Sequence, residues 1–78
     1  MITVKYFGAI AEQTKRNEEE FSFSKNSLSV LLSDLTLKYA LNELSFSVAV
    51  NQKMVQNPAD FNLKSNDVIA LLPPFAGG

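Results

Sequence analysis

The chain has 78 residues, of which 46% are hydrophobic, so it is long enough for one small domain with a single core. Its formal net charge of −1 argues against an electrostatic nucleic-acid surface, and the absence of cysteine and histidine excludes disulfides, thiolate nucleophiles and the commonest general base. It has neither the apolar run of about 20 residues that a membrane span needs nor a signal-peptide pattern, and we therefore expect a soluble, cytoplasmic protein.

Two strands are expected at the start of the chain. Residues 1–7 alternate between two faces, which is the period of a strand with one buried side. Gly8 ends this pattern, and a short helical turn over 9–16 is expected before a second strand over 18–24. The three glutamates at 18–20 are interpreted as a solvated strand entry. The side chains predicted to point inward are Ile2, Val4, Tyr6, Phe21 and Phe23.

An amphipathic helix is expected next, from Ser27 as its N-cap to about Tyr39 or Ala40. Its apolar residues recur at three- and four-residue spacing, which is the pattern of a helix with one buried stripe. The predicted core stripe is Leu28, Leu31, Leu32, Leu35 and Tyr39. Val30 and Leu37 are expected to widen this apolar face, which would suit a helix packed against a broad sheet.

Two short strands are expected after the helix. Residues 46–50 alternate again, and the Asn-Gln pair at 51–52 predicts a tight turn into a short strand over 53–55. An irregular crossover is then expected over 57–63. The side chains predicted to point inward are Phe46, Val48, Val50 and Val55.

The last strand is expected over 68–72, after a turn in which Asn66 tolerates a left-handed conformation and Asp67 supports the turn. Ile69 and Leu71 are predicted to point to the core, and two prolines then end the strand. The order β–β–α–β–β–β favours the α+β class and a β-grasp fold. In this fold a mixed sheet of about five strands carries one main helix, and the first and last strands run parallel at its centre. We expect residues 1–74 to form this domain and 75–78 to form a flexible Gly-Gly tail.

Candidate chemistry concentrates at the C-terminal end. The sequence has no Gly-rich phosphate loop and no Ser–His or Cys–His pair, and its aspartates are dispersed, so we expect no catalytic side chains and no metal site. Gly77 and Gly78 lack β-carbons and can enter a channel too narrow for other residues. The Gly78 carboxylate is a poor acyl donor until it is activated, for example by adenylation. The nucleophile and the base would then belong to a partner.

A docking surface is predicted on the outer face of the sheet. Strand alternation places Phe7 opposite the core-facing residues of the first strand, and it places Leu72 on the same outer face of the last strand. Phe75 follows on the exit segment, and Met54 in the adjoining short strand could complete the cluster. A contiguous apolar patch beside a reactive end indicates a partner-binding surface. The alternative interpretation is that Phe7 and Leu72 only cap the end of the sheet.

These features together resemble the small, sulfur-carrying subunit of molybdopterin synthase, a ubiquitin-like β-grasp family. The resemblance extends over the whole chain in order and length. It is carried by Ile2-Thr3-Val4-Lys5-Tyr6-Phe7, by Val48-Ala49-Val50-Asn51-Gln52, by the strand from Asp67 to Leu72 and by Pro73-Pro74-Phe75-Ala76-Gly77-Gly78.

The resemblance implies a sulfur-transfer cycle. An activating enzyme related to the ubiquitin activators would adenylate the Gly78 carboxylate with ATP and magnesium, and a sulfur donor enzyme would convert it to a thiocarboxylate. The tail would then enter the large synthase subunit, in a heterotetramer, and give its sulfur to a pterin precursor. Gly77 would provide access, and no cofactor would be bound permanently. Neither nucleic acid nor membrane is expected as a partner.

Three other functions stay open at this point. A thiamine-pathway sulfur carrier shares the fold and the Gly-Gly end but usually lacks the Pro-Pro-x-x that precedes it here. A ubiquitin-like modifier would use the same end to form isopeptide bonds with lysines. A pure adaptor would bind through the sheet edge alone and would not need the Gly-Gly end.

Overall fold

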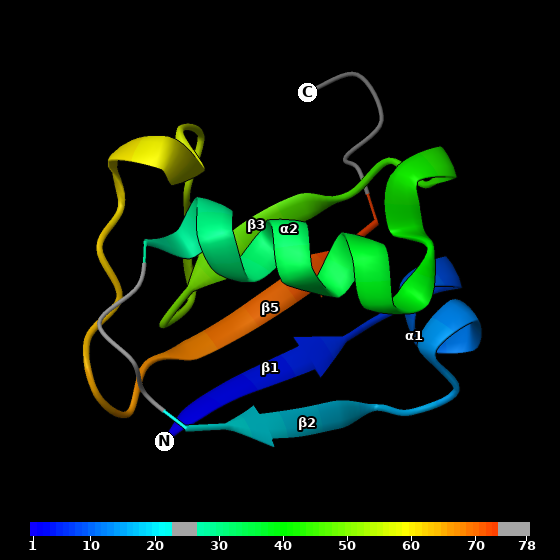
Figure 1. Cartoon of the computed structure of the whole chain (residues 1–78), viewed down its shortest axis with the longest axis horizontal. Helices are drawn as coiled ribbons and strands as arrows, with labels where there is room; N and C mark the ends of the chain where they lie inside the picture. The colour runs from blue at the N-terminus through cyan, green and yellow to red at the C-terminus, as the bar shows by residue number, and fades with distance from the viewer. Residues whose placement is uncertain (23–26, 74–78) are drawn as a thin grey trace.

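Alternating side chains build a five-stranded mixed sheet in the computed structural model, which describes residues 1–22 and 27–73 (Figure 1). The elements in chain order are β1 (Ile2–Tyr6), α1 (Ala9–Thr14), β2 (Glu18–Phe21), α2 (Leu28–Tyr39), β3 (Ser47–Val50), β4 (Lys53–Met54) and β5 (Val68–Leu72). The structure also has two short 3-10 helices: η1 (Leu41–Glu43) follows α2, and η2 (Pro58–Asp60) precedes β5. The predicted order of strands and main helix is confirmed.

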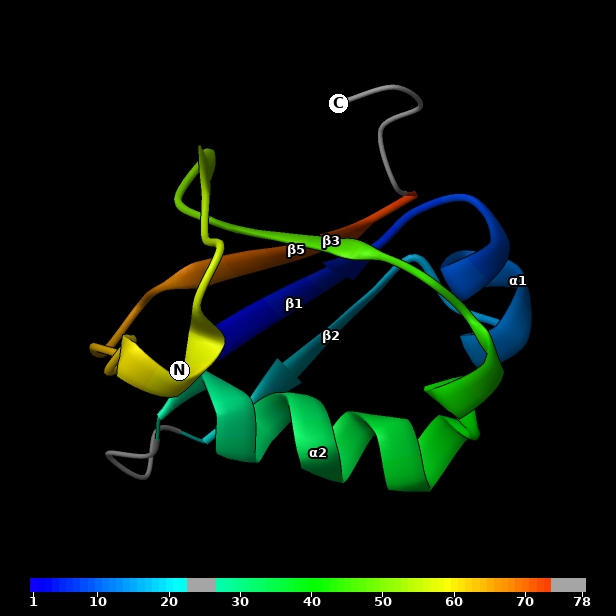
Figure 2. The ribbon, with the colours of Figure 1, turned by 90° about the horizontal axis from the view of Figure 1, so that it is seen from above.

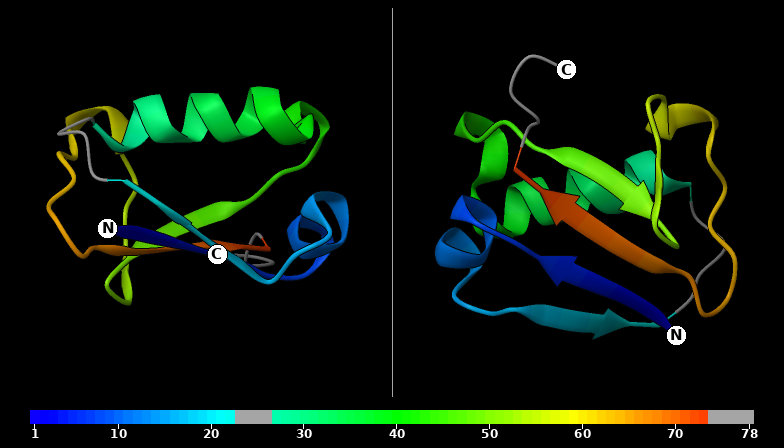
Figure 3. Two further views of the ribbon diagram at one scale, coloured as in Figure 1. Left: turned by 60° about the horizontal axis from the view of Figure 1, so that its bottom comes forward. Right: turned by 180° about the vertical axis from the view of Figure 1, so that it is seen from behind.

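The first and last strands lie side by side in the sheet, whose strand order is β2-β1-β5-β3-β4. β1 pairs in parallel with β5, with Val4 opposite Ile69, and β1 pairs antiparallel with β2. β5 in turn pairs antiparallel with β3. Two parallel strands cannot be joined by a tight turn. In the part of the chain that connects β1 to β5, helix α2 therefore crosses one face of the sheet. The right-hand view of Figure 3 shows this arrangement from behind, with the sheet in front of the helix.

Helix α2 begins and ends as its sequence predicts. The hydroxyl of Ser27 accepts a hydrogen bond of 3.4 Å from the backbone N–H of Val30, and Ala40 ends the helix in a left-handed conformation with φ 56°. Of the predicted stripe, Leu28 and Leu35 are buried. The other members, which are half-buried, are Leu31, Leu32 and Tyr39.

The prediction that Val30 and Leu37 widen the apolar face of α2 is wrong. Val30 is 44% exposed and Leu37 is 84% exposed. A helix turns about 100° per residue, so these two positions lie about 180–200° around the axis from Leu28. They therefore face away from the sheet and contribute little to the core.

The core lies between α2 and the inner face of the sheet, as Figure 2 shows from above. β1, β3 and β5 each contribute every second residue to it, which is the period that the sequence predicts. Its buried members are Ile2, Val4, Tyr6, Ile10, Leu28, Leu35, Leu41, Val48, Val50, Leu63, Ile69 and Leu71. Within the described residues, no helix has the length and hydropathy to cross a bilayer.

The second strand is shorter than predicted, because β2 ends at Phe21 and Ser22 already lies outside it. Phe21 is half-buried and packs against the core, as expected. Phe23 lies outside the described residues, so the prediction for it stays a prediction.

The predicted turns take left-handed backbone conformations. Asn51 and Gln52 have φ of 51° and 72°, which allows a two-residue connection between β3 and β4. Asn66 has φ 72°, and the buried Asp67 accepts a hydrogen bond of 2.8 Å from the backbone N–H of Lys64. The prediction that Asp67 supports its turn is therefore confirmed.

Candidate functional site

The last strand leads the chain out of the sheet beside the end of β1. The backbone N–H of Phe7 donates a 3.2 Å hydrogen bond to the carbonyl of Leu71, so pairing continues just past the end of β1. Leu72 is the last strand residue, and Pro73 follows it. The proline has no N–H to continue a ladder. The pairing of β5 therefore ends at this corner.

Gly8 shapes this corner by a close approach. Its φ of 59° is a left-handed conformation, and a β-carbon built on it would lie 2.8 Å from Cγ of Pro73. Any other residue would therefore push the proline ring or shift the backbone. The predicted site residues Phe75, Gly77 and Gly78 lie outside the described residues.

The outer face of the sheet carries the other predicted partner-binding residues. Phe7 is 42% exposed and Met54 is 48% exposed, while Leu72 is half-buried on the same face. The pairing register places Leu72 opposite Ser47 of β3, and it places Met54 opposite Ala49. We call the place where Pro73 follows β5 and meets Gly8 the exit corner. Phe7 and Leu72 lie at this corner, and Met54 lies toward the β4 edge.

Two alanines lie between these apolar side chains. Ala70 of β5 pairs with Ala49 of β3, which pairs with Met54 of β4. Ala49 is only 5% exposed although it points to the outer face. We call Phe7, Ala49, Met54, Ala70 and Leu72 the outer apolar patch. The sequence analysis did not include Ala49 in this patch, although its position between the inward-facing Val48 and Val50 indicates that it faces outward.

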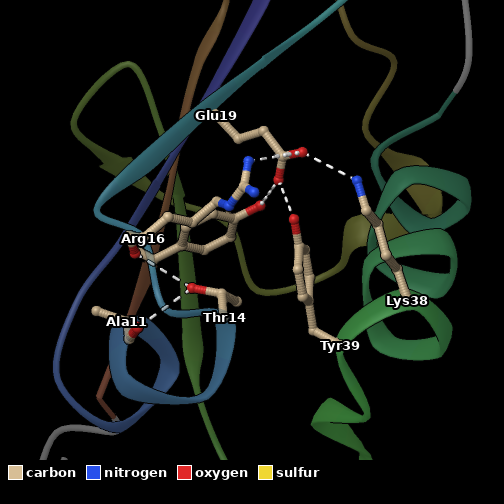
Figure 4. Close-up of polar contacts among 7 residues, drawn as sticks. Ala11, Thr14, Arg16, Glu19, Lys38 and Tyr39 are labelled. Atoms are coloured by element: carbon tan, nitrogen blue, oxygen red, sulfur yellow. Dashed lines mark hydrogen bonds and ion pairs between the residues drawn. The ribbon is translucent and has the colours of Figure 1, made fainter.

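A cluster of polar side chains lies at the opposite face of the sheet, and its centre is the carboxylate of Glu19 (Figure 4). The hydroxyls of Tyr6 and Tyr39 donate to one carboxylate oxygen, at 2.9 and 2.5 Å. The Lys38 ammonium lies 2.9 Å from the other oxygen, and the Arg16 guanidinium lies 3.3 Å from it. The interpretation of all three glutamates as solvated is therefore wrong for Glu19, whose side chain is 12% exposed.

Strand alternation explains why Glu19 differs from its neighbours. Glu19 lies opposite Val4 in the pairing of β2 with β1, so it faces inward with Phe21. Glu18 and Glu20 face outward and are exposed, as predicted. The period of the strand was the signal that could have identified Glu19 from the sequence.

The cluster shifts the ionisation of its members in opposite directions. Burial raises the pKa of the Glu19 carboxyl, but hydrogen bonds from Tyr39, Lys38 and Tyr6 outweigh this effect and bring its pKa below the usual value. Burial and the neighbouring carboxylate raise the pKa of the Tyr6 hydroxyl far above its ordinary value. The hydrogen bond to Glu19 raises the pKa of the Lys38 ammonium. The carboxylate is therefore held charged and fully hydrogen-bonded, which suits a structural role between β1, β2 and α2.

Potential metal ligands are dispersed in the part of the chain that the structure describes. In residues 1–22 and 27–73, no three histidine, cysteine, aspartate or glutamate side chains are grouped so that they could hold a metal ion.

Comparison with known proteins relates this arrangement to a family. A sequence model of the ThiS family matches residues 4–78. A chain of the Helicobacter pylori complex between subunits 1 and 2 of molybdopterin-converting factor is 34% identical, with 99% of this chain and 97% of that chain covered and a TM-score of 0.70.

Two archaeal structures are also similar. A candidate molybdopterin converting factor subunit 1 from Pyrococcus furiosus is 23% identical, covers 95% of this chain and 97% of its own, and has a TM-score of 0.83. The small archaeal modifier protein 1 of Methanosarcina acetivorans is 27% identical, covers 99% and 95%, and has a TM-score of 0.74. These similarities confirm the predicted ubiquitin-like β-grasp fold and the resemblance found in the sequence.

Proposed function

The chain belongs to the ThiS family, and from this premise we propose that it is the sulfur-carrying small subunit of a molybdopterin synthase. Its family and its relatives make it a sulfur carrier or a ubiquitin-like modifier. The observation that carries the finer proposal is the 34% identity, over 99% of the chain, to a chain of a molybdopterin-converting-factor complex. The Pro-Pro-Phe-Ala-Gly-Gly segment that follows β5 supports it.

The proposed chemistry begins at the carboxylate of Gly78. A carboxylate oxygen attacks the α-phosphorus of ATP on an activating enzyme, which holds the Mg²⁺, and pyrophosphate leaves. Hydrosulfide released by a sulfur donor enzyme attacks the acyl carbon of this mixed anhydride, the bond from that carbon to the AMP oxygen breaks, and a thiocarboxylate remains. Gly77 allows the segment to enter the narrow active sites of both partners, because it has no β-carbon.

The second half of the cycle takes place in the large synthase subunit. The thiocarboxylate sulfur attacks a carbon of the pterin precursor and displaces an oxygen substituent from that carbon, and water then attacks the acyl carbon of Gly78. The carbon–sulfur bond to Gly78 breaks, so the carboxylate is restored and the sulfur stays on the pterin. The chain carries the sulfur atom on Gly78 and delivers it to the active site, and the acid–base groups belong to the large subunit.

The outer apolar patch is the proposed dock for the large subunit. Phe7 and Leu72 lie beside the exit corner, Met54 extends the surface toward β4, and Phe75 belongs to the segment that follows. Buried aromatic side chains usually dominate binding energy at such surfaces. Docking there would place the segment that follows Pro73 at the mouth of the partner's active site.

Intact mass spectrometry tests the proposal. The protein is incubated with its activating enzyme, ATP, Mg²⁺ and sulfide, and the expected gain is ~16 Da, which fragmentation must place at Gly78 because methionine oxidation has a similar mass. Adding the large subunit and the precursor should reverse the gain. A variant with one residue added after Gly78 is the control and should gain nothing. Sulfur transfer by that extended chain would contradict the proposal.

A modifier function is the second candidate, because the chain is 27% identical to a small archaeal modifier protein over 99% of its length. Such a protein would form an isopeptide bond between Gly78 and a lysine of a target. The last basic residue is Lys64, so trypsin would leave residues 65–78 attached to the modified lysine. Recovery of that branched peptide from cells, without mass gain by sulfur, would favour the modifier. Sulfur transfer to a thiazole precursor instead of a pterin would favour the thiamine pathway.

A further inference from the structure

The outer face of the sheet contains a cation that the apolar patch does not explain. Lys5 lies in β1 between Glu18 of β2 and Ala70 of β5, and it is exposed. Among the strand residues that the structure describes, it is the cation on this face. Both ion pairs found among the described residues involve Glu19 on the inner side, and neither includes Lys5.

A hollow of about 300 Å³ opens beside Lys5. Its lining residues are Lys5, Asn51, Gln52 and Val68, so it spans β5 from β1 to the turn between β3 and β4. Lys5 therefore borders a concavity on the side away from Glu18, which belongs to β2.

The polar groups around the hollow differ in their availability. The Asn51 amide is already engaged, because its nitrogen donates to Asp67 at 2.9 Å and its oxygen accepts from the backbone N–H of Val68 at 3.0 Å. Gln52 is exposed, and its side chain makes no hydrogen bond within residues 1–22 and 27–73. The Lys5 ammonium and the Gln52 amide are thus the donors that this hollow offers to a ligand.

A partner that covers the outer apolar patch would also cover Lys5, because Lys5 is paired with Ala70 of that patch. Removing an ammonium from water without an anion paired to it is costly, and Lys5 forms no ion pair with the neighbouring Glu18, whereas a complementary carboxylate recovers much of that cost. We propose that an acidic side chain of the large subunit enters the hollow and pairs with Lys5, with the Gln52 amide donating to its second oxygen. This inference rests on the proposed function, since it names a recognition contact of the same docking surface.

Binding measurements with the isolated large subunit test the contact. Lys5→Met keeps an apolar stem and removes the charge, so we expect about tenfold weaker binding and a weaker dependence of the dissociation constant on salt. Lys5→Arg retains the charge and should bind within about threefold of the wild type. Lys53→Met is the matched control, because Lys53 is exposed but pairs with the core-facing Val50 and so points to the other side of the sheet. It should bind like the wild type.

Melting curves keep the interpretation independent of folding. Lys5 is exposed, so Lys5→Met should melt within a few degrees of the wild type. If Lys5→Met binds the large subunit with wild-type affinity and salt dependence while Phe7→Ala binds weakly, the surface docks without an acidic contact and this inference is overturned. If the wild type itself does not bind the large subunit, the proposed function fails first.

Discussion

The two faces of the sheet use the same strands for different purposes. The inner face is covered by α2, and the side chains that β1, β3 and β5 send there are buried. The outer face has alanines in its middle and exposes Phe7 and Met54 at its margins. Its charged strand residues include Lys5, Glu18 and Glu20, and Lys5 and Glu18 lie opposite each other without an ion pair between them in the described structure.

Polar groups mark the difference most clearly. On the inner side, Glu19 accepts hydrogen bonds from Tyr6, Lys38 and Tyr39 and forms an ion pair with Arg16. On the outer side, Lys5 and Gln52 border a hollow, and neither side chain forms a hydrogen bond or ion pair within the described residues. A fully hydrogen-bonded polar cluster fixes how a helix and a sheet fit together, whereas donors on an exposed face are available to bind a partner. The comparison predicts that inner substitutions reduce stability and outer ones reduce binding.

The sharpest test uses two adjacent leucines of β5. Leu71→Ala should destabilise the fold by about 2–5 kcal/mol, because Leu71 is fully buried and the substitution leaves a cavity. Leu72→Ala should cost under about 1 kcal/mol in stability and weaken binding to the large subunit by roughly 1–3 kcal/mol. Denaturant unfolding and calorimetric titration measure the two effects. The same loss of stability in both variants would show that the faces are not distinct.

The Glu19 cluster is the next largest test. Glu19→Ala would leave the buried Tyr6 hydroxyl without its acceptor and remove the partner of Lys38, so we expect a loss of about 2–3 kcal/mol. Glu19→Gln should cost less, because an amide oxygen can still accept from the tyrosines. Unfolding free energies at neutral pH measure both. Wild-type stability of Glu19→Ala would contradict the structural role.

The lowered pKa of Glu19 adds a pH signature to this test. The unfolded chain binds the proton more readily than the folded one, so the stabilisation is complete above the unfolded value of about 4.3 and is lost as pH falls through the folded pKa. The stability difference between wild type and Glu19→Gln should therefore shrink as the pH is lowered below about 4.3. Acid titrations of both proteins provide the measurement, and a constant difference would refute the assignment.

A smaller effect is expected at the exit corner. Gly8→Ala forces a left-handed residue with a β-carbon against Pro73, and it should cost about 1–2 kcal/mol. Pro73→Ala in the same chain should recover part of that loss, because it removes the ring atom that the β-carbon meets. A double-mutant cycle by denaturant unfolding isolates this pair. Strict additivity of the two changes would mean that they do not interact.

The smallest effect is expected on the exposed side of α2. Leu37→Ala should change stability by less than about 0.5 kcal/mol, since Leu37 is 84% exposed. Leu35→Ala, two residues earlier, should cost about 2–5 kcal/mol, since Leu35 is buried. Thermal melts compare the pair. A large loss for Leu37→Ala would restore the broader apolar face that the sequence suggested.

Local patterns were sufficient for the elements and for most of their faces. The two-residue period of the strands placed Val4, Ile69 and Leu71 in the core, and Ser27 capped α2 as expected. Hydrophobicity alone misled at Val30 and Leu37, because an apolar residue on a helix is buried only if its angle points to the sheet. The docking role of Phe7, Met54 and Leu72 stays a prediction, although the structure places all three on the outer face.

The sequence by itself determined the order of elements, the capped helix, the left-handed turns and the Gly-Gly motif, because each depends on residues close together in the chain. Only the tertiary structure decided which distant groups meet. It brought Tyr6, Lys38 and Tyr39 to Glu19, it packed Pro73 against Gly8, and it placed Lys5 beside the turn at Gln52. These contacts join residues that lie up to tens of positions apart, and their geometry is set by the pairing of β1 with β5 and by the crossing of α2, which no local period encodes.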